Sequence, residues 1–272
     1  VTGTDQEKAD ALKAYANFNS NAYATVASNA TASVPAGYYL VKDQDPAEGT
    51  KLDAYTTYIV KVVDQNVTVA PKSDVPSFEK KLKDSNDTEG TLSDWQDAAD
   101  WDMGDDVPFK LEGTVASNYA SYKTYYFAFH DVEERGLTFN KDSVKVYVDN
   151  TAITSGYEVV TEGLADGCTF EVKFADLKQI SAVKAGSKIR VEYTSKLNEN
   201  AVIGEQGNVN KAKLQYSNNP NDEQGGENGP TGETPWDNVI VFTYKTVINK
   251  VDDENQPLKG AEFTLSKKMK NG

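Results

Sequence analysis

The middle of the chain alternates hydrophobic and polar residues in short runs, the pattern of β-strands that bury one face. Turns rich in Gly, Asn and Asp separate these runs, and a further run, Val239–Tyr244, follows a long polar stretch. The preceding runs are Phe78–Leu82, Val107–Glu112, Thr124–His130, Val144–Val148, Tyr157–Val160, Thr169–Phe174, Lys188–Thr194 and Asn210–Tyr216. This succession of short strands predicts an antiparallel β-sandwich.

The region before this series contains few strands. Hydrophobic residues at helical spacing predict one short helix over about Thr4–Phe18. Two strand-like runs follow, Tyr38–Val41 and Tyr55–Val63, and after a polar turn comes the short run Val67–Val69. So few strands cannot close a sandwich of their own.

Prolines and a loss of alternation mark the start of the middle domain. Pro71 and Pro76 bracket the polar segment 72–75, so we assign this segment as a linker and residues 76–246 as one domain. Inside that domain, Asn218–Glu233 has almost no hydrophobic residue, which predicts an exposed, mobile loop.

The last segment, residues 247–272, begins another unit. Its two strand-like runs, Asn249–Asp252 and Gly260–Leu265, flank a polar turn, which predicts a β-hairpin. We expect this hairpin to open a third module that the sequence does not complete. The predicted fold class is therefore all-β, with tandem sandwiches and a short helix in the N-terminal region.

The composition fits an exposed β protein and excludes two function classes. Fifteen Tyr, ten Phe and only two Met residues suit half-buried strands better than helices. With 42 acidic against 28 basic residues and a net charge of -14, nucleic acid is excluded as a partner. Neither a run of apolar residues long enough for a membrane span nor a basic, hydrophobic leader occurs, so we expect no membrane span and no signal peptide in this sequence.

Few residues offer ligands for a metal or a cofactor, and we expect neither. Cys168 and His130 are the single cysteine and histidine, which excludes an internal disulfide and a zinc site with the usual four ligands. His130 alternates outward and is expected at the surface, while Cys168 has no paired base and is expected to be inert. One acidic segment lacks the spacing of a calcium loop; its carboxylates are Asp100, Asp102, Asp105 and Asp106.

Six phrases, in order along the chain, carry a family resemblance. They are PSFEKKLKD, GDDVPFKLEGT, YFAFHDVEERGLTF, VEYTSKLNENAVIG, GNVNKAKLQYSNNP and NKVDDENQPLKGAEFTL. Together they resemble the backbone subunit of sortase-assembled pili of Gram-positive bacteria. The resemblance implies tandem immunoglobulin-like modules of the two types first described in a collagen adhesin, with residues 1–71 as the C-terminal part of an N-terminal module, residues 76–246 of the A type and residues 247–272 opening one of the B type. It also implies a structural protein of an extracellular, wall-anchored pilus, and not an enzyme.

The resemblance further implies that the middle domain cross-links itself. Residue by residue, it makes Lys80 the amine, Asp131 the catalytic acid and Asn210 the amide of a lysine–asparagine isopeptide bond. Lys81 is the competing lysine, because a shift of one residue in strand register would turn it inward instead. Period-two alternation favours Lys80, which shares the hydrophobic face of its strand.

Burial favours this reaction on physical grounds. Desolvation shifts a buried lysine toward its neutral amine and a buried carboxyl toward its protonated form. The amine can attack the amide carbonyl, while the acid polarises that carbonyl and passes protons to the departing ammonia. Holding the groups in contact replaces a bimolecular encounter, with an effective molarity of about 10⁵ M or more.

Lys72 matches the lysine that a pilin-specific sortase joins to the C-terminal threonine of the next subunit. The aromatic residue that usually precedes the proline is Ala70 here. The implied partners are that sortase, neighbouring copies of the same pilin, tip or base pilins, and host-surface ligands. Two other positions are expected to form no bond: Lys250, whose partners in a B-type module are absent from the sequence, and Lys42–Asp43, which stands where a catalytic glutamate would be sought.

The residues alone leave two other functions open. A monomeric adhesin built from the same modules would bind a host protein or glycan through the Asn218–Glu233 loop or an aromatic surface. A glycan-acting enzyme would use Asp131 with Glu133 and Glu134 as paired carboxylates, although no second constellation with a cleft signature accompanies them.

Overall fold

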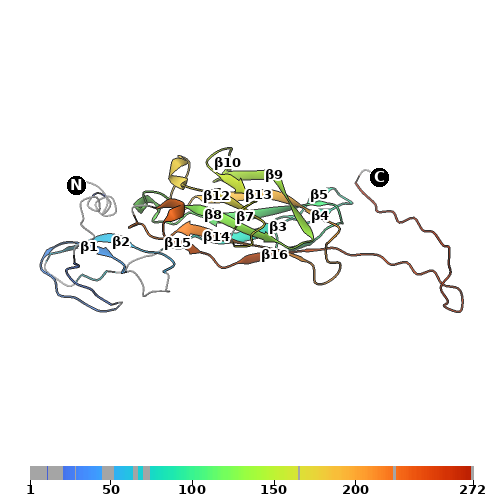
Figure 1. Cartoon of the computed structure of the whole chain (residues 1–272), viewed down its shortest axis with the longest axis horizontal. Helices are drawn as coiled ribbons and strands as arrows, with labels where there is room; N and C mark the ends of the chain where they lie inside the picture. The colour runs from blue at the N-terminus through green and yellow to red at the C-terminus, as the bar shows by residue number, and fades with distance from the viewer. Residues whose placement is uncertain are drawn as a thin grey trace.

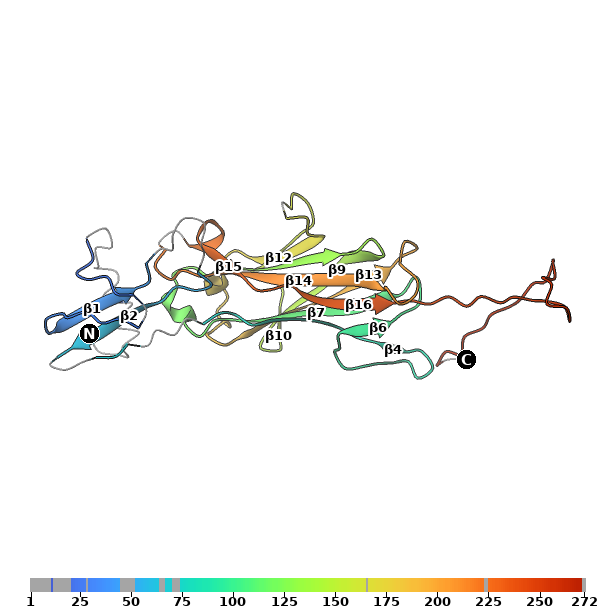
Figure 2. The ribbon, with the colours of Figure 1, turned by 90° about the horizontal axis from the view of Figure 1, so that it is seen from below.

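The computed structural model confirms the all-β fold class and is elongated along one axis (Figure 1). It describes residues 11, 21–27, 29–44, 52–63, 67–69, 74–164, 166–222 and 225–270. The predicted helix, apart from Ala11, and the linker lysine Lys72 lie outside the described residues. The paired strands β1 (Gly37–Lys42) and β2 (Thr57–Val62) lie at one end of the sandwich, and residues 247–270 extend from the opposite end (Figures 1 and 2).

Two sheets form the middle domain. The first has the order β10-β9-β13-β7-β3, and its strands are β3 (Phe78–Leu82), β7 (Asp106–Thr114), β9 (Leu137–Val148), β10 (Thr151–Ile153) and β13 (Lys188–Leu197). The second has the order β11-β12-β8-β14-β16-β6, with β15 also paired to β14. Its strands are β6 (Ala98–Asp100), β8 (Phe127–Glu133), β11 (Glu158–Val160), β12 (Phe170–Phe174), β14 (Asn208–Ser217), β15 (Thr231–Glu233) and β16 (Asp237–Phe242).

Short elements complete the fold. Only β16 and β6 pair in parallel among the described strands, and the remaining pairs are antiparallel. Three single-turn helices and one separate strand pair lie in the connections; they are η1 (Tyr119–Ser121), η2 (Leu177–Gln179), η3 (Gly226–Asn228), β4 (Ser85–Asn86) and β5 (Thr91–Leu92). Among the residues that the structure describes, no helix is long and apolar enough to cross a membrane.

Alternation of side chains builds the core between the two sheets. Along β13, Ile189, Val191 and Leu197 are fully buried, and more exposed residues alternate with them. Aromatic rings fill the space between the sheets, for example Phe139 and Phe170, whose ring centroids stack 3.7 Å apart. Because the inward positions are desolvated, a polar side chain on the same faces must find its partners inside the core.

The strands predicted for the middle domain are all present, with shifted ends. The largest difference is β9, which begins at Leu137, whereas the sequence predicts a strand only over Val144–Val148. Its first half is largely exposed and polar, so its alternation is weak. Strands β4, β5, β6, β10 and β15 have two or three residues each and carry no periodic signal of their own.

The prediction of an exposed Asn218–Glu233 loop is wrong for its first residues. Asn218 is 2% exposed, and its side-chain amide donates to the carbonyl of Leu52 at 2.7 Å. Its own carbonyl accepts the backbone N–H of Tyr55 at 2.7 Å. The segment is polar because its amides satisfy backbone groups of the N-terminal unit, so polarity here marks a contact between two parts of the chain.

Two other predicted strands are shorter or missing. Val67–Val69 has no regular secondary structure. In the last segment the predicted hairpin is reduced to one antiparallel bridge between Val251 and Pro257, closed by a hydrogen bond from the N–H of Leu258 to the carbonyl of Lys250. Most side chains in this segment are exposed, and without the rest of a core a two-stranded hairpin is only marginally stable.

Candidate functional site

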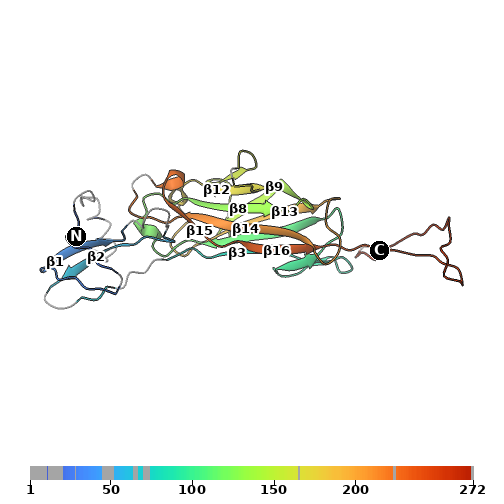
Figure 3. The ribbon, with the colours of Figure 1, turned by 60° about the horizontal axis from the view of Figure 1, so that its bottom comes forward.

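Lys80 lies inside the protein, at the centre of an edge strand. It has no exposed surface, because strand β3 turns Lys80 and Leu82 toward the core. Lys81 points the other way and forms an ion pair with Asp97. Strand β3 runs alongside β14 and β16 of the second sheet (Figure 3), and the backbone N–H of Lys80 donates to Asp237 of β16 at 2.8 Å.

The amine of Lys80 meets a carboxylate and a phenol. Lys80 Nζ lies 2.5 Å from Asp131 Oδ2 and donates to the hydroxyl of Tyr193 at 2.8 Å. That hydroxyl in turn donates to Asp131 Oδ2 at 2.7 Å. Asp131 is completely buried on β8, and its second oxygen, Oδ1, has no hydrogen-bond partner. The lysine and the acid therefore touch inside the core, with no exposed surface.

Asn210 shares the same phenol. On β14 it lies directly opposite Glu133 of β8, and it has no exposed surface. Its Nδ2 donates to the Tyr193 hydroxyl at 3.0 Å and to Glu133 Oε1 at 3.4 Å, while its Oδ1 has no partner. The amine of Lys80 and the amide of Asn210 are thus both within one hydrogen bond of the Tyr193 oxygen.

Desolvation sets the protonation of these groups. Burial lowers the pKa of Lys80, and the negative charge of Asp131 opposes this shift only in part. Burial likewise raises the pKa of Asp131 against the pull of Lys80, and it raises the pKa of Glu133 to about 8, with Asp131 adding to the effect. The pKa of Tyr193 is raised well above its usual value by burial and by the two acids. Each of these shifts moves its group toward the neutral form.

Two residues that were not predicted from the sequence, Tyr193 and Ser195, complete the cluster. Tyr193 has the pattern of an ordinary core tyrosine of β13, and only its hydroxyl contacts distinguish it. Ser195 also faces inward on β13, where its hydroxyl donates to Glu133. A serine at an otherwise hydrophobic inward position, and a glutamate two residues after Asp131 on the same face, are the signals that would have found them.

The other predicted positions lie apart from this cluster. Lys72 is outside the described residues, and Lys250 is exposed near the C-terminal bridge. Asp43 accepts hydrogen bonds from the backbone and side chain of Thr56. In the acidic segment, Asp102 forms an ion pair with Lys267.

Two expectations about the outer face of β8 are wrong. His130 is 6% exposed and therefore not a surface residue, because the chain before β12 covers it. Cys168 does have a base beside it, since its Sγ lies 3.8 Å from His130 Nδ1. Burial raises the pKa of its thiol, and its inertness stays a prediction. Alternation predicted which face His130 occupies, but it gives no information on what covers that face.

Glu133 gives the site a testable pH dependence. Its pKa rises from an ordinary 4.5 to about 8 on folding, so between these values the folded chain holds a proton that the unfolded chain releases. The contribution of Glu133 to the free energy of unfolding is therefore fully present below about pH 4.5 and is lost as pH rises through about 8. We expect a Glu133→Gln variant to lose this part of the pH dependence in melting temperatures measured from pH 5 to 8. A variant whose stability changes with pH as in the parent would contradict the assignment.

Comparison with known proteins bears on the fold and the family. No model of a known protein family matches the chain. The trypsin-resistant surface T6 protein of Streptococcus pyogenes serotype M6 is 31% identical over 209 residues, which cover 72% of this chain and 37% of that protein. The chain thus spans less than two fifths of this curated relative.

Solved pilin structures share the fold. The T6 backbone pilin of serotype M6 Streptococcus pyogenes superposes with a TM-score of 0.57 and 19% identity, over 95% of this chain and 58% of that one. The C-terminal fragment of the major pilin GBS80 of Streptococcus agalactiae gives a TM-score of 0.50 and 20% identity, over 68% of this chain and 61% of that one. The resemblance that the sequence phrases indicate is therefore confirmed: this chain is a relative of the backbone pilins of Gram-positive bacteria and shares their fold.

Proposed function

We propose that this chain belongs to the shaft subunit of a covalent pilus on a Gram-positive cell surface, and that its middle domain locks itself through a bond between Lys80 and Asn210. One observation carries the proposal: a fully buried lysine contacts an acid and, through one phenol, an asparagine amide. A buried lysine is costly unless it is paired or neutral. A cross-link removes that cost permanently, because an amide nitrogen carries no charge.

The bond would form by amide exchange. The neutral Lys80 Nζ attacks Cγ of Asn210, and the protonated carboxyl of Asp131 donates to the amide oxygen. The new Nζ–Cγ bond replaces the Cγ–Nδ2 bond, one amine proton passes through the carboxyl group to Nδ2, and ammonia leaves. Asp131 Oδ1 and Asn210 Oδ1 both lack hydrogen-bond partners in the unreacted core, and a proton on Asp131 would supply a donor that the amide oxygen can accept.

The position of the bond suits a protein under tension. The N-terminal unit and the C-terminal segment lie at opposite ends of the long axis (Figure 2), so in a filament force would enter the sandwich near β3 and leave it after β16. A bond from β3 to β14 would carry that force covalently between the sheets. The chain between residues 80 and 210 would then be unable to unravel.

The mass of the denatured chain tests whether the bond between Lys80 and Asn210 forms. We expect a mass one ammonia below the sequence value, and a branched peptide that joins the Lys80 and Asn210 regions after digestion. An unmodified mass, or Lys80 free to react with amine reagents after denaturation, would overturn self-locking and leave a sandwich held by packing alone.

A substitution of Lys72 tests whether this residue is the site of polymerisation. In cells that assemble the pilus, we expect a Lys72→Ala variant to lose the ladder of covalent surface polymers, because the sortase would have no amine to which it could join the next subunit. Lys61→Ala is the matched control, since Lys61 is an exposed lysine of the same N-terminal unit. Polymers that persist without Lys72 would assign the linkage to another lysine and favour the adhesin function.

Specific observations weaken the two alternatives. The start of the Asn218–Glu233 loop, proposed as a ligand-binding surface of an adhesin, is turned onto residues of the N-terminal unit. For a glycan-acting enzyme, Asp131 has no exposed surface and the oxygen Glu133 Oε2 is buried, so a sugar ring cannot reach the paired carboxylates.

A further inference from the structure

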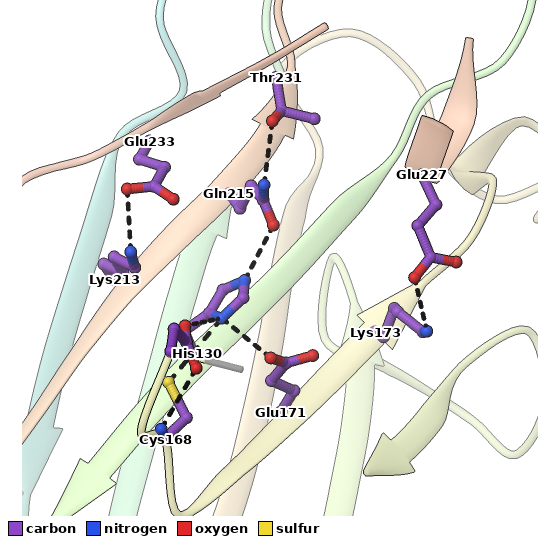
Figure 4. A network of polar contacts seen from close by, with 10 residues as sticks. His130, Cys168, Glu171, Lys173, Lys213, Gln215, Glu227, Thr231 and Glu233 are labelled. Carbon is purple, nitrogen blue, oxygen red and sulfur yellow. Dashed lines mark hydrogen bonds and ion pairs between the residues drawn. The ribbon is translucent and has the colours of Figure 1, made fainter. Parts of the chain in front are cut away.

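A second polar cluster lies on the opposite face of β8 from the lysine site. Figure 4 shows Cys168, which lies in the segment before β12, below His130 of β8, with Glu171 of β12 beside the imidazole ring. Asp166 of the same segment completes the group. His130 and Glu171 line a pocket of about 330 Å³ that opens to solvent, so small ions have a path to the cluster.

The imidazole of His130 has a fixed orientation. Its Nε2 lies 3.0 Å from Gln215 Oε1, which can only accept a hydrogen bond, so Nε2 carries the proton. The amide of Gln215 is held in turn, because its nitrogen donates to Thr231 Oγ1 at 2.9 Å (Figure 4). In the neutral ring, Nδ1 therefore presents a lone pair, which is the form in which histidine binds a metal.

Oxygen and sulfur atoms converge on that lone pair. Nδ1 lies 2.8 Å from Asp166 Oδ2, 3.2 Å from Glu171 Oε1 and 3.8 Å from Cys168 Sγ. The lysines of the neighbouring strands form their ion pairs with other acids, since Lys173 pairs with Glu227 and Lys213 pairs with Glu233, each at 2.9 Å (Figure 4). Electron pairs facing one another at such distances repel unless a proton or a metal ion lies between them.

We propose that His130, Asp166, Cys168 and Glu171 form a site for one divalent transition metal of the zinc type. Nitrogen, sulfur and carboxylate oxygen are the donors that zinc prefers, at about 2.0–2.3 Å in tetrahedral geometry. These distances place neighbouring ligand atoms about 3.3–3.6 Å apart. The three separations from Nδ1 bracket that range, and the ligand atoms of His130, Asp166 and Cys168 all lie within 4.8 Å of one another, so side-chain movements could bring the ligand atoms to these separations.

The metal would hold the segment between β11 and β12 against the second sheet. Two of its ligands, Asp166 and Cys168, come from the segment between β11 and β12, and His130 comes from the central part of the second sheet. In the sequence only the histidine and the cysteine stand out as zinc ligands, which is too few to predict a site. The two carboxylates supply the missing ligands, and nothing in their spacing resembles a zinc motif.

Cobalt(II) titration of the metal-free chain tests this proposal. We expect one equivalent to bind, with the ligand-field bands of tetrahedral cobalt and a near-ultraviolet thiolate charge-transfer band, and zinc to displace it. Cys168→Ser should abolish the charge-transfer band. Gln215→Leu should weaken binding roughly 10- to 100-fold, because Gln215 only orients the ring. Glu162→Gln, which removes an exposed carboxylate from the same connection between β11 and β12 that is not a proposed ligand, should bind like the parent.

A second measurement needs no variant. Zinc should protect Cys168 from alkylation in the folded chain, and a chelator should restore the reaction. Absence of saturable cobalt binding would overturn the proposal, as would unchanged cobalt spectra in Cys168→Ser. So would NMR evidence that His130 keeps protons on both ring nitrogens in excess zinc, because the acids would then partner an imidazolium.

Discussion

The Lys80→Ala variant is expected to have the full mass of its sequence and to unfold roughly 10–20 °C below the unsubstituted protein. A bond between residues 80 and 210 closes a long loop, which on the chain-entropy account of cross-links stabilises by roughly 4–5 kcal/mol. For a domain of this size each kcal/mol shifts the melting temperature by about 2–4 °C. Intact mass under denaturing conditions and scanning calorimetry measure the two effects on the same sample.

Lys81→Ala is the matched control for this experiment. Lys81 is the neighbouring lysine, but its side chain is 25% exposed and pairs with Asp97 at the surface. An exposed ion pair contributes at most about 1 kcal/mol, so this variant should keep the cross-link and melt within a few degrees of the parent. If Lys81→Ala instead lost the cross-link, the strand register that turns Lys80 inward would be wrong.

Most of the sandwich could be predicted because its strands alternate strongly. Strands such as β12 and β13 bury every second side chain, and period-two patterns record that burial directly. The first half of β9 and the short strand β15 were not predicted, because their pairing depends on backbone hydrogen bonds to strands that are separated from them in sequence. The start of the Asn218–Glu233 loop was misjudged because polar residues satisfy backbone groups as readily as they face water.

The candidate site was only partly visible in the sequence. Lys80, Asp131 and Asn210 were named through the family resemblance, and the structure brings the first two into direct contact. That they react stays a prediction. Tyr193 joins the three, and no pattern distinguishes a core tyrosine with a functional hydroxyl from one that only packs. His130 and Cys168 were judged in isolation, although Asp166 and Glu171 lie close to Cys168 in sequence, and only tertiary structure brings His130 to them.

Asp131→Asn is expected to leave the fold intact and to slow cross-linking by about 10²- to 10⁴-fold, the usual contribution of a positioned general acid–base group. Asparagine occupies the same volume, but its amide cannot release a proton to the oxygen of Asn210 or return one to the leaving nitrogen. Lys80 keeps its buried position, and desolvation still favours the neutral amine. The variant should therefore be purified with the unmodified mass and acquire the cross-link only over long incubation.

Comparison with Glu133→Gln separates the two acids. Glu133 contacts the amide nitrogen of Asn210 at 3.4 Å and does not contact Lys80, so its loss should slow the reaction less than the loss of Asp131. A protonated Glu133 also cannot repel the negative charge that develops on the amide oxygen, which makes its raised pKa a favourable feature. If Asp131→Asn cross-linked as fast as the parent while Glu133→Gln did not, the roles would be exchanged and Glu133 would be the acid. If both variants cross-linked at the parent rate, proton transfer by a carboxyl group would not limit the reaction, and the proximity of amine and amide around Tyr193 would have to account for its rate.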